Sequence, residues 1–220
     1  MNPAPQPPRT LAVLVSGTGS NLQAILDASQ SGLLPLKPVA VLSDRAQAPA
    51  LDRARRHGIP AFSLELEAFP NRSTWESSLN EQLDRCHPDL IAMAGFMRIL
   101  QAETVNRFAG RLLNIHPSLL PRHPGLHPHR RALEQGDLEH GATVHLVVPE
   151  VDAGFRLAQI RVPIRSSDTE DFLIERTKQA EHRLYPAVLA ELAHGRLVIA
   201  PDAVFWKGRR LESPLEFPFS

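Results

Sequence analysis

The sequence predicts a doubly wound α/β fold with a mostly parallel β-sheet. Three observations predict it: a series of short apolar strands, helical segments between them, and a glycine-rich turn directly after the first strand. Such alternation is typical of βαβ units, in which connecting helices cover both faces of a parallel sheet. The chain has 220 residues, which suits one large domain or two tightly joined halves.

The first half of the chain carries the clearest alternation. Residues 11–15 (LAVLV) are continuously apolar, as expected of a buried parallel strand, and the turn at 16–21 leads into a helix from about Leu22. Further strands are predicted at residues 38–42, 61–64, 90–94 and 112–115. Helices are predicted between them, at residues 48–57, 72–86 and 102–108.

The second half changes character. A loop rich in proline and histidine, residues 117–128, precedes a helix that ends near Gly136. Residues 143–148 and 160–164 read as strands, a long helix begins at Asp168, and residues 204–209 predict a hairpin with a Lys-Gly turn. We expect a single domain over residues 10–212, with halves at 10–109 and 110–212. A flexible tail (1–9) precedes it and a second tail (213–220) follows.

The composition excludes several classes of protein. Lysine plus arginine and aspartate plus glutamate both number 24, so nothing indicates a nucleic-acid groove or a membrane surface. No stretch approaches the roughly 20 apolar residues of a membrane span. The one cysteine, Cys86, excludes an intrachain disulfide and is expected to be a partly buried spectator. We expect a cytoplasmic protein that binds neither nucleic acid nor membrane.

The turn after the first strand predicts a phosphate site. Two glycines let the backbone approach an anion, and the N–H groups at the following helix start point at it. Gly19, Ser20 and Asn21 are the candidate ligands. A dinucleotide site would want a third glycine, but that position is Leu22, although Asp44 lies near where a ribose-binding acid would sit. A tight turn without ligand is the plainer alternative.

The segment Asn114-Ile115-His116-Pro117 is the most informative. Strand alternation places Asn114 and His116 on one face at the carboxyl end of a strand. An amide beside an imidazole suits a developing oxyanion, because the amide can donate to it and the imidazole can relay a proton. Asp152, in the loop after a later strand, is the candidate for orienting the imidazole. Each residue alone could be structural; together with the glycine turn they favour catalysis.

A metal site is not expected. His123, His127 and His129 lie in one loop, but no H-E-x-x-H helix or cysteine pair accompanies them. Ser118 lacks the G-x-S-x-G context of a hydrolase nucleophile and reads as a turn residue.

Five segments taken together resemble one known family. In order and at comparable spacing, GTGSNLQAI, AGFMRIL, LLNIHPSLLP, GLHPHRRALE and AEHRLYP resemble the phosphoribosylglycinamide formyltransferase family, from about Leu11 to Arg210. The resemblance implies a Rossmann-like formyltransferase fold. It also implies formyl transfer from 10-formyltetrahydrofolate, a cosubstrate, to the amine of glycinamide ribonucleotide in purine biosynthesis, by a monomer or homodimer. Residues 10–109 would then be the phosphate-binding half and 110–212 the catalytic and folate half.

The resemblance also assigns roles to individual residues. It implies that the catalytic group is Asn114, His116 and Asp152, with Asp152 keeping the imidazole protonated. It implies that the substrate is bound by Gly19, Ser20, Asn21, Arg72, Lys178 and Glu181. It implies that the folate is bound by Met97, Arg98, Ile99, Leu100, Asn114, Val151 and Asp152.

One departure from the family pattern bears on Asp152. The family usually continues Gly-Gly-Pro-Val-Ile, whereas this chain continues Ala153-Gly154-Phe155-Arg156-Leu157. Lineage drift in a mobile loop is one explanation, and altered folate affinity or a displaced Asp152 is the other. Two further functions stay open: a formyltetrahydrofolate deformylase, and a degenerate folate- or nucleotide-binding module.

Overall fold

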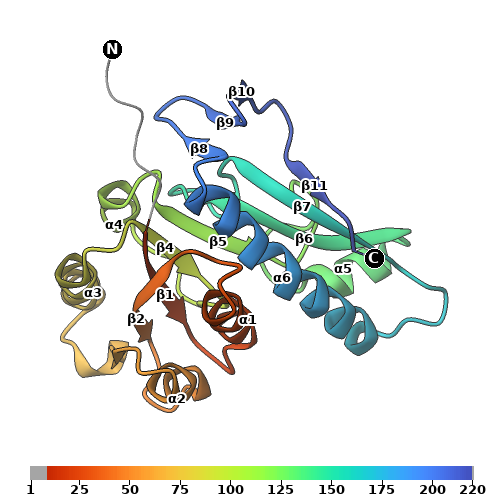
Figure 1. Cartoon of the computed structure of the whole chain (residues 1–220). Coiled ribbons are helices and arrows are strands. Elements are labelled where there is room, and N and C mark those ends of the chain that lie inside the picture. The colour runs from red at the N-terminus through yellow and green to blue at the C-terminus, as the bar shows by residue number, and fades with distance from the viewer. Residues whose placement is uncertain (1–8, 220) are drawn as a thin grey trace.

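The computed structural model describes residues 9–219, and an eight-stranded sheet forms its centre (Figure 1). The strands run in the order β11-β7-β6-β5-β4-β1-β2-β3. Their bounds are β1 (Thr10–Val15), β2 (Lys37–Ser43), β3 (Ala61–Ser63), β4 (Leu90–Met93), β5 (Leu112–His116), β6 (Glu139–Leu146), β7 (Arg156–Pro163) and β11 (Leu215–Phe217). The expected doubly wound, mostly parallel sheet is confirmed.

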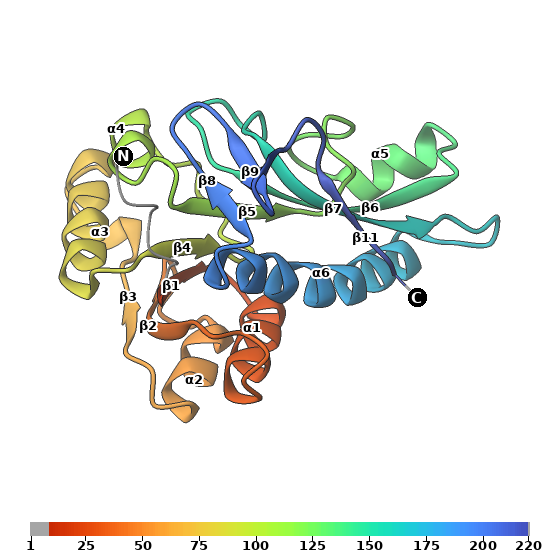
Figure 2. The ribbon, with the colours of Figure 1, turned by 45° about the horizontal axis from the view of Figure 1, so that its top comes forward.

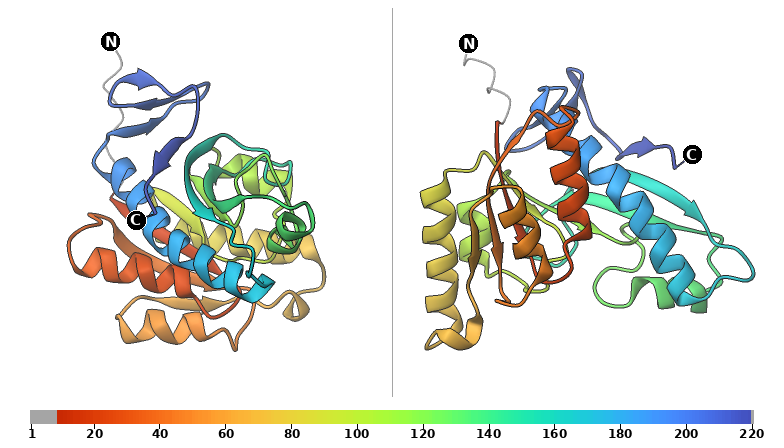
Figure 3. Two further views of the ribbon diagram at one scale, coloured as in Figure 1. Left: turned by 90° about the vertical axis from the view of Figure 1, so that its right-hand side faces the viewer. Right: turned by 60° about the horizontal axis from the view of Figure 1, so that its bottom comes forward.

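Helices cover both faces of this sheet. On one face lie α1 (Ser20–Gln30), α2 (Pro49–Arg56) and the long α6 (Glu170–Ala193), which Figure 3 shows running beside α1; the other face is covered by α3 (Arg72–Cys86) and α4 (Ala102–Arg107). The sequence of β1 explains both cores: Leu11, Val13 and Val15 enter one, whereas Ala12 and Leu14 enter the other. A short 3₁₀ helix, Leu66–Ala68, and α5 (Pro128–Glu134) complete the set.

The chain direction changes at β6. Strands β3, β2, β1, β4 and β5 are parallel, but β6 runs antiparallel to both β5 and β7. In the β5–β6 pair, Asn114 lies opposite His145. Strands β6 and β7 each begin four residues before the predicted bounds of 143–148 and 160–164, so the antiparallel arm is longer than the sequence predicts.

A small second sheet follows α6. It consists of β8 (Leu197–Ile199), β9 (Val204–Trp206) and β10 (Arg209–Arg210), in the order β10-β9-β8 (Figure 2). The predicted Lys-Gly hairpin is confirmed: Lys207 (φ 49°) and Gly208 (φ 76°) both have the positive φ that a two-residue type I′ turn requires.

The predicted C-terminal tail needs a correction. Residues 215–217 form β11, which pairs in parallel with β7 and covers that edge of the sheet (Figure 2). Leu215, Phe217 and Phe219 pack against the core, and burial of these apolar side chains stabilises β11. The strand is too short for the sequence pattern to predict it. The predicted N-terminal tail lies outside the described residues except for Arg9, whose backbone N–H donates to Asp89 Oδ2 at 2.7 Å.

Tyr185 connects α6 to the middle of the sheet. Its side chain is fully buried, and its hydroxyl lies 3.2 Å from the Met93 carbonyl oxygen of β4 and 3.1 Å from the Leu113 carbonyl oxygen of β5. The hydroxyl therefore meets carbonyl groups of two neighbouring strands, at the end of β4 and near the start of β5. Within residues 9–219 none of the helices is long and apolar enough to cross a membrane.

Candidate active site

A cavity of about 470 Å³ opens at the carboxyl ends of β4 and β5. Ligands of open α/β sheets gather at this end of the strands. The cavity brings together ten of the residues predicted from the sequence: Asn21, Met97, Arg98, Ile99, Leu100, Asn114, His116, Val151, Asp152 and Glu181.

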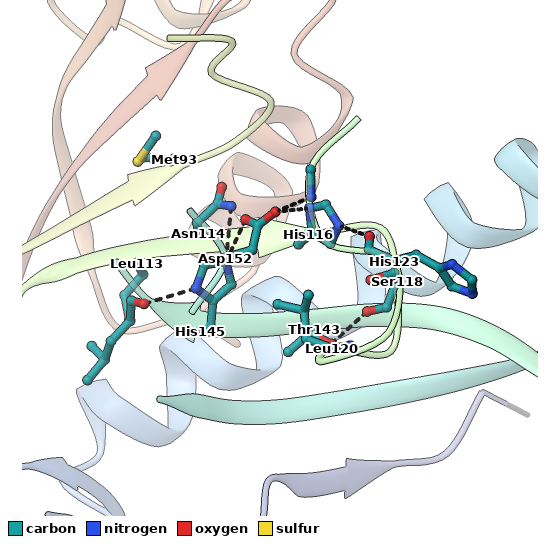
Figure 4. Close-up of polar contacts among 12 residues, drawn as sticks. Met93, Leu113, Asn114, His116, Ser118, Leu120, His123, Thr143, His145 and Asp152 are labelled. Carbon is teal, nitrogen blue, oxygen red and sulfur yellow. Dashed lines mark hydrogen bonds and ion pairs between the residues drawn. The ribbon is translucent and has the colours of Figure 1, made fainter. Parts of the chain in front are cut away.

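His116 and Asp152 meet in this cavity (Figure 4). His116 ends β5, and its Nδ1 lies 3.3 Å from Asp152 Oδ2. The same carboxylate oxygen accepts the Gly125 backbone N–H at 2.7 Å. Asp152 adopts a left-handed conformation (φ 54°), which aspartate tolerates better than most residues, and this sharp turn aims the carboxylate inward.

His145 is a fourth member of the group that the sequence reading missed. Its Nε2 lies 3.2 Å from Asn114 Nδ2 and 3.5 Å from Asp152 Oδ1, and its Nδ1 lies 2.9 Å from the Leu146 carbonyl oxygen. His145 Nε2 therefore lies between the Asn114 amide and the Asp152 carboxylate. Asn114 Nδ2 has no other hydrogen-bond partner among the described residues, so it can donate to a ligand oxygen.

Opposing effects set the protonation of the central pair. Burial lowers the pKa of His116 below its ordinary value, although the Asp152 charge and the His123 carbonyl act in the other direction. Burial raises the pKa of Asp152, but His145, the Gly125 amide and His116 together outweigh it and lower the value to about 2. Burial and the Asp152 charge therefore act on the imidazole in opposite directions, and the role of Asp152 in keeping it protonated stays a prediction.

Two buried acceptors form another wall of the cavity. Asn21 Nδ2 donates to Glu181 Oε2 at 2.8 Å, and both residues line the cavity. Burial raises the pKa of Glu181 to about 7, against the opposing effects of Asn21 and Lys178. Asn21 Oδ1 is also buried and has no hydrogen-bond partner among the described residues. This wall suits a ligand that brings N–H or O–H donors.

The glycine turn presents the start of α1. Gly19 caps the helix in a left-handed conformation (φ 72°), and no side chain caps the first-turn amides. A Cβ on Gly19 would lie 2.6 Å from Ala50 Cβ, so glycine allows α1 and α2 to approach closely here. The exposed amides suit an anion, as the sequence predicts. Gly19 and Ser20 themselves do not line the cavity, whereas the adjacent Asn21 does.

The segment predicted to bind folate forms an apolar side of the cavity. Met97 and Ile99 line it although they are 67% and 61% exposed, so apolar area is left free for a ligand. Arg98 Nε bonds Asp44 Oδ2 at 2.7 Å, and Asp44 is buried. This ion pair occupies the acid that a dinucleotide site would use for ribose, which weakens that alternative.

Two further predicted substrate ligands, besides Gly19 and Ser20, do not line the cavity. Arg72, at the start of α3, is exposed; its guanidinium bonds Glu76 and the Ile99 carbonyl, and none of its described contacts reaches the glycine turn. Lys178 is exposed and pairs with Glu175 at 3.7 Å. Their assigned roles remain predictions.

The unusual residues after Asp152 leave its carboxylate in contact with His116. A Cβ on Gly154 would lie 1.8 Å from the Leu146 carbonyl oxygen, so this glycine is required where β7 leaves the loop. Arg156 begins β7 and donates from Nη1 to the Leu120 carbonyl at 3.0 Å. The changed sequence after Asp152 therefore does not displace its carboxylate from His116 in this structure.

The histidine-rich loop shows no arrangement typical of a metal centre. Within residues 9–219, no three histidine, cysteine, aspartate or glutamate side chains converge as metal ligands. Ser118 donates to the Arg122 carbonyl at 2.7 Å, in keeping with a turn residue.

The chain is similar in sequence to known proteins over most of its length. Residues 9–189 match the family described as Formyl transferase. The chain is 46% identical over 201 residues to the phosphoribosylglycinamide formyltransferase of Escherichia coli K12, covering 91% of this chain and 95% of that protein. It is 42% identical over 192 residues to the human trifunctional purine biosynthetic protein adenosine-3, of which it covers 19%.

Solved structures agree with these sequence matches. The phosphoribosylglycinamide formyltransferase of Coxiella burnetii is 44% identical, with a TM-score of 0.91 and coverage of 96% of this chain and 100% of that chain. A formyltetrahydrofolate deformylase of Pseudomonas putida, 24% identical with a TM-score of 0.81, shares the fold. Because the match to bacterial phosphoribosylglycinamide formyltransferases is far above 30% identity and extends over nearly the full length of both chains, this chain belongs to the phosphoribosylglycinamide formyltransferase family.

Proposed function

We propose that this protein transfers the formyl group of 10-formyltetrahydrofolate to the amine of glycinamide ribonucleotide. One observation carries the proposal: a single cavity joins the Asn114–His116–Asp152 group to Asn21 and Glu181 beside the start of α1. A phosphorylated amine held at that end would direct its nitrogen toward the imidazole. The sequence matches support the same substrates.

The cavity fits a folate cosubstrate. Its volume, about 470 Å³, lies within the range of small-molecule pockets. Exposed apolar side chains at Met97, Ile99 and Val151 offer contacts to a flat ring system, and Asn114 offers an amide. When bound, the cosubstrate supplies the formyl carbon at which the substrate amine reacts.

The protein groups would then act in sequence. Neutral His116 accepts a proton from the attacking amine, because burial favours its neutral form before the reaction. Asp152 stabilises the imidazolium that results, at 3.3 Å. Asn114 donates its free amide hydrogen to the oxygen that becomes negative. The imidazolium can then return the proton to the departing nitrogen of the folate.

Glu181 and Asn21 are placed to hold the amine end. Their buried oxygens are acceptors, and a substrate amine or hydroxyl would satisfy Asn21 Oδ1. The phosphate would lie at the α1 amides with Gly19, Ser20 and, through longer-range attraction, Lys178. Arg72 contacts the Ile99 carbonyl, so its position favours a role on the folate side rather than at the phosphate.

The test is to incubate the purified protein with 10-formyltetrahydrofolate, with and without glycinamide ribonucleotide, and to measure formylated ribonucleotide and free tetrahydrofolate. We expect both products only when both reactants are present. Release of tetrahydrofolate without the ribonucleotide would identify a deformylase, and folate binding without any product would identify a binding module.

The His116→Ala variant supplies the first prediction. We expect its rate of formyl transfer to fall by roughly 10²–10⁴-fold, because the variant lacks the group that moves the proton. An unchanged circular dichroism spectrum would show that the fold is intact. Near-normal turnover would remove His116 from the mechanism.

A cytoplasmic location and assembly as a monomer or homodimer also remain predictions. Size-exclusion chromatography with light scattering would determine the assembly.

A further inference from the structure

His123 lies beside His116 but points its own ring elsewhere. Its backbone carbonyl oxygen lies 3.0 Å from His116 Nε2, whereas its side chain turns away from the catalytic group (Figure 4). A carbonyl can only accept, so this contact requires a hydrogen on His116 Nε2. In the neutral ring, Nδ1 is then the unprotonated nitrogen, and Nδ1 is the atom that faces Asp152.

The His123 side chain is held by Asp137. His123 Nε2 lies 2.7 Å from Asp137 Oδ2, and the two side chains are only 5% and 8% exposed. Asp137 also contacts the Arg122 guanidinium, so the carboxylate joins two consecutive residues of the loop. His123 has φ 53°, a left-handed conformation that is uncommon for residues other than glycine.

The short segment 123–125 touches both catalytic partners. The His123 carbonyl fixes one nitrogen of His116, and two residues later the Gly125 amide donates to Asp152 Oδ2 at 2.7 Å. A displacement of His123 would therefore disturb the imidazole and the carboxylate together. Misplacement by about 1 Å can cost on the order of 10²-fold in rate.

We propose that His123, held by Asp137, is a positioning residue that sets the ring orientation and tautomer of His116. Neither His123 nor Asp137 lines the cavity, so neither touches the reactants. The inference rests on the proposed formyl transfer, because it concerns how that site is kept ready.

Two variants of His123 test the proposal. His123→Phe keeps a ring but cannot bond Asp137, whereas His123→Gln retains an N–H donor on a side chain of similar reach. We expect kcat to fall about 10-fold in His123→Phe, with both KM values within about 2-fold of the parent, and to recover largely in His123→Gln. Asp137→Asn, which retains the size of Asp137, should lower kcat in the same direction.

A spectroscopic measurement separates positioning from mere stability. ¹⁵N NMR of histidine-labelled protein reports which ring nitrogen of His116 carries the proton; we expect Nε2 in the parent and in His123→Gln, and a mixture in His123→Phe. Asp168→Asn is the matched control, because Asp168 is also a buried carboxylate bonded to an arginine, Arg176, but is remote from the cavity. It should affect thermal stability and leave kcat and the His116 signals unchanged.

The parent protein is assayed first, so that absence of formyl transfer there would contradict the proposed function rather than this inference. With an active parent, the positioning role is overturned by parental kcat and tautomer in His123→Phe. A parent protein in which Nδ1 of His116 carries the proton would also overturn it. So would a loss of kcat in both His123 variants that parallels their loss of thermal stability while the His116 tautomer stays unchanged.

Discussion

At His116, burial and a neighbouring carboxylate act on the imidazole in opposite directions. Burial is the larger effect and lowers the pKa of His116, while Asp152 raises it. A neutral imidazole that becomes charged only as the amine attacks is well suited to a proton relay, since it can first accept and then donate. In the proposed reaction, the Asp152 carboxylate would stabilise a positive charge that appears on His116 as the amine attacks.

This balance gives a prediction for the titration of His116. In the parent, NMR should show His116 titrating below the ordinary histidine value of about 6.5. Asp152→Asn removes the favourable charge, so the pKa should fall further and kcat should fall as well. A rise of the His116 pKa in Asp152→Asn would contradict the arrangement, and Asp202→Asn, remote from the cavity, serves as the control.

Glu181 gives a prediction about stability and pH. Its pKa in the folded protein is raised from 4.5 to about 7. Between these values the folded state binds more protons than the unfolded state, so the stability contribution of this group decreases as the pH rises and is lowest above about 7. Glu181→Gln should therefore stabilise the protein above pH 7, by on the order of 2 kcal/mol, and not at pH 4.

Urea unfolding of parent and Glu181→Gln at pH 8 and at pH 4 checks this difference. The variant should also bind glycinamide ribonucleotide more weakly, because the amine loses a charged partner. Equal stability of the two proteins at pH 8 would show that Glu181 is not strained by its burial.

Residue-level reading of the sequence found three of the four polar side chains that meet at the end of β5. The sequence identifies Asn114, His116 and Asp152 because they lie at a predicted strand end and in a predicted turn. His145 was missed because its importance comes from lying opposite Asn114 in an antiparallel pair, and neither the direction of β6 nor its register is written in a local pattern.

The start of α1 shows how an element prepares a site. Gly19 lets the helix begin against α2 and leaves its first-turn amides without a side-chain cap. The sequence predicts that the helix begins at about Leu22, but α1 begins at Ser20, directly after the left-handed Gly19. This shifts Asn21 into the helix, from which its side chain reaches Glu181.

Gly19→Ala should impair both stability and binding. The added methyl group would meet Ala50 at 2.6 Å, and alanine disfavours φ 72°. We expect a loss of about 1–3 kcal/mol in the free energy of unfolding and a raised KM for glycinamide ribonucleotide, with the KM for the folate little changed. Gly32→Ala is a suitable control, because Gly32 also has a positive φ (78°) but an added Cβ meets nothing within 4 Å. Equal KM values in the two variants would argue against a phosphate at α1.

On the scale of the whole molecule, the parallel strands were predictable and the edge strand was not. Continuous apolar runs separated by helices identify β1, β2, β4 and β5 directly. Strand β11 has three residues, which is too short for a periodic signal, and it exists because β7 offers an edge and the core offers a place for Leu215 and Phe217. Single-sequence patterns do not contain such long-range pairing.

Removal of residues 213–220 should therefore destabilise the protein. The truncation takes away the pairing with β7 and the packing of Leu215, Phe217 and Phe219 on the core. We expect Tm to fall by roughly 4–8 °C, corresponding to about 2 kcal/mol for a chain of this size. Glu216→Gln, which removes only the exposed ion pair with Arg161, should change Tm by much less. An unchanged Tm after truncation would show that β11 contributes nothing to stability.

The position of Tyr185 on α6 ties the substrate wall to the backbone of the sheet. Glu181 and Tyr185 are one helical turn apart and therefore point from the same side of α6, one toward the cavity and the other toward the carbonyl groups of Met93 and Leu113. A rigid helix cannot slide along its axis without moving both. The two contacts of Tyr185 therefore anchor the helix that carries Glu181 to β4 and to β5, the strand that ends at His116.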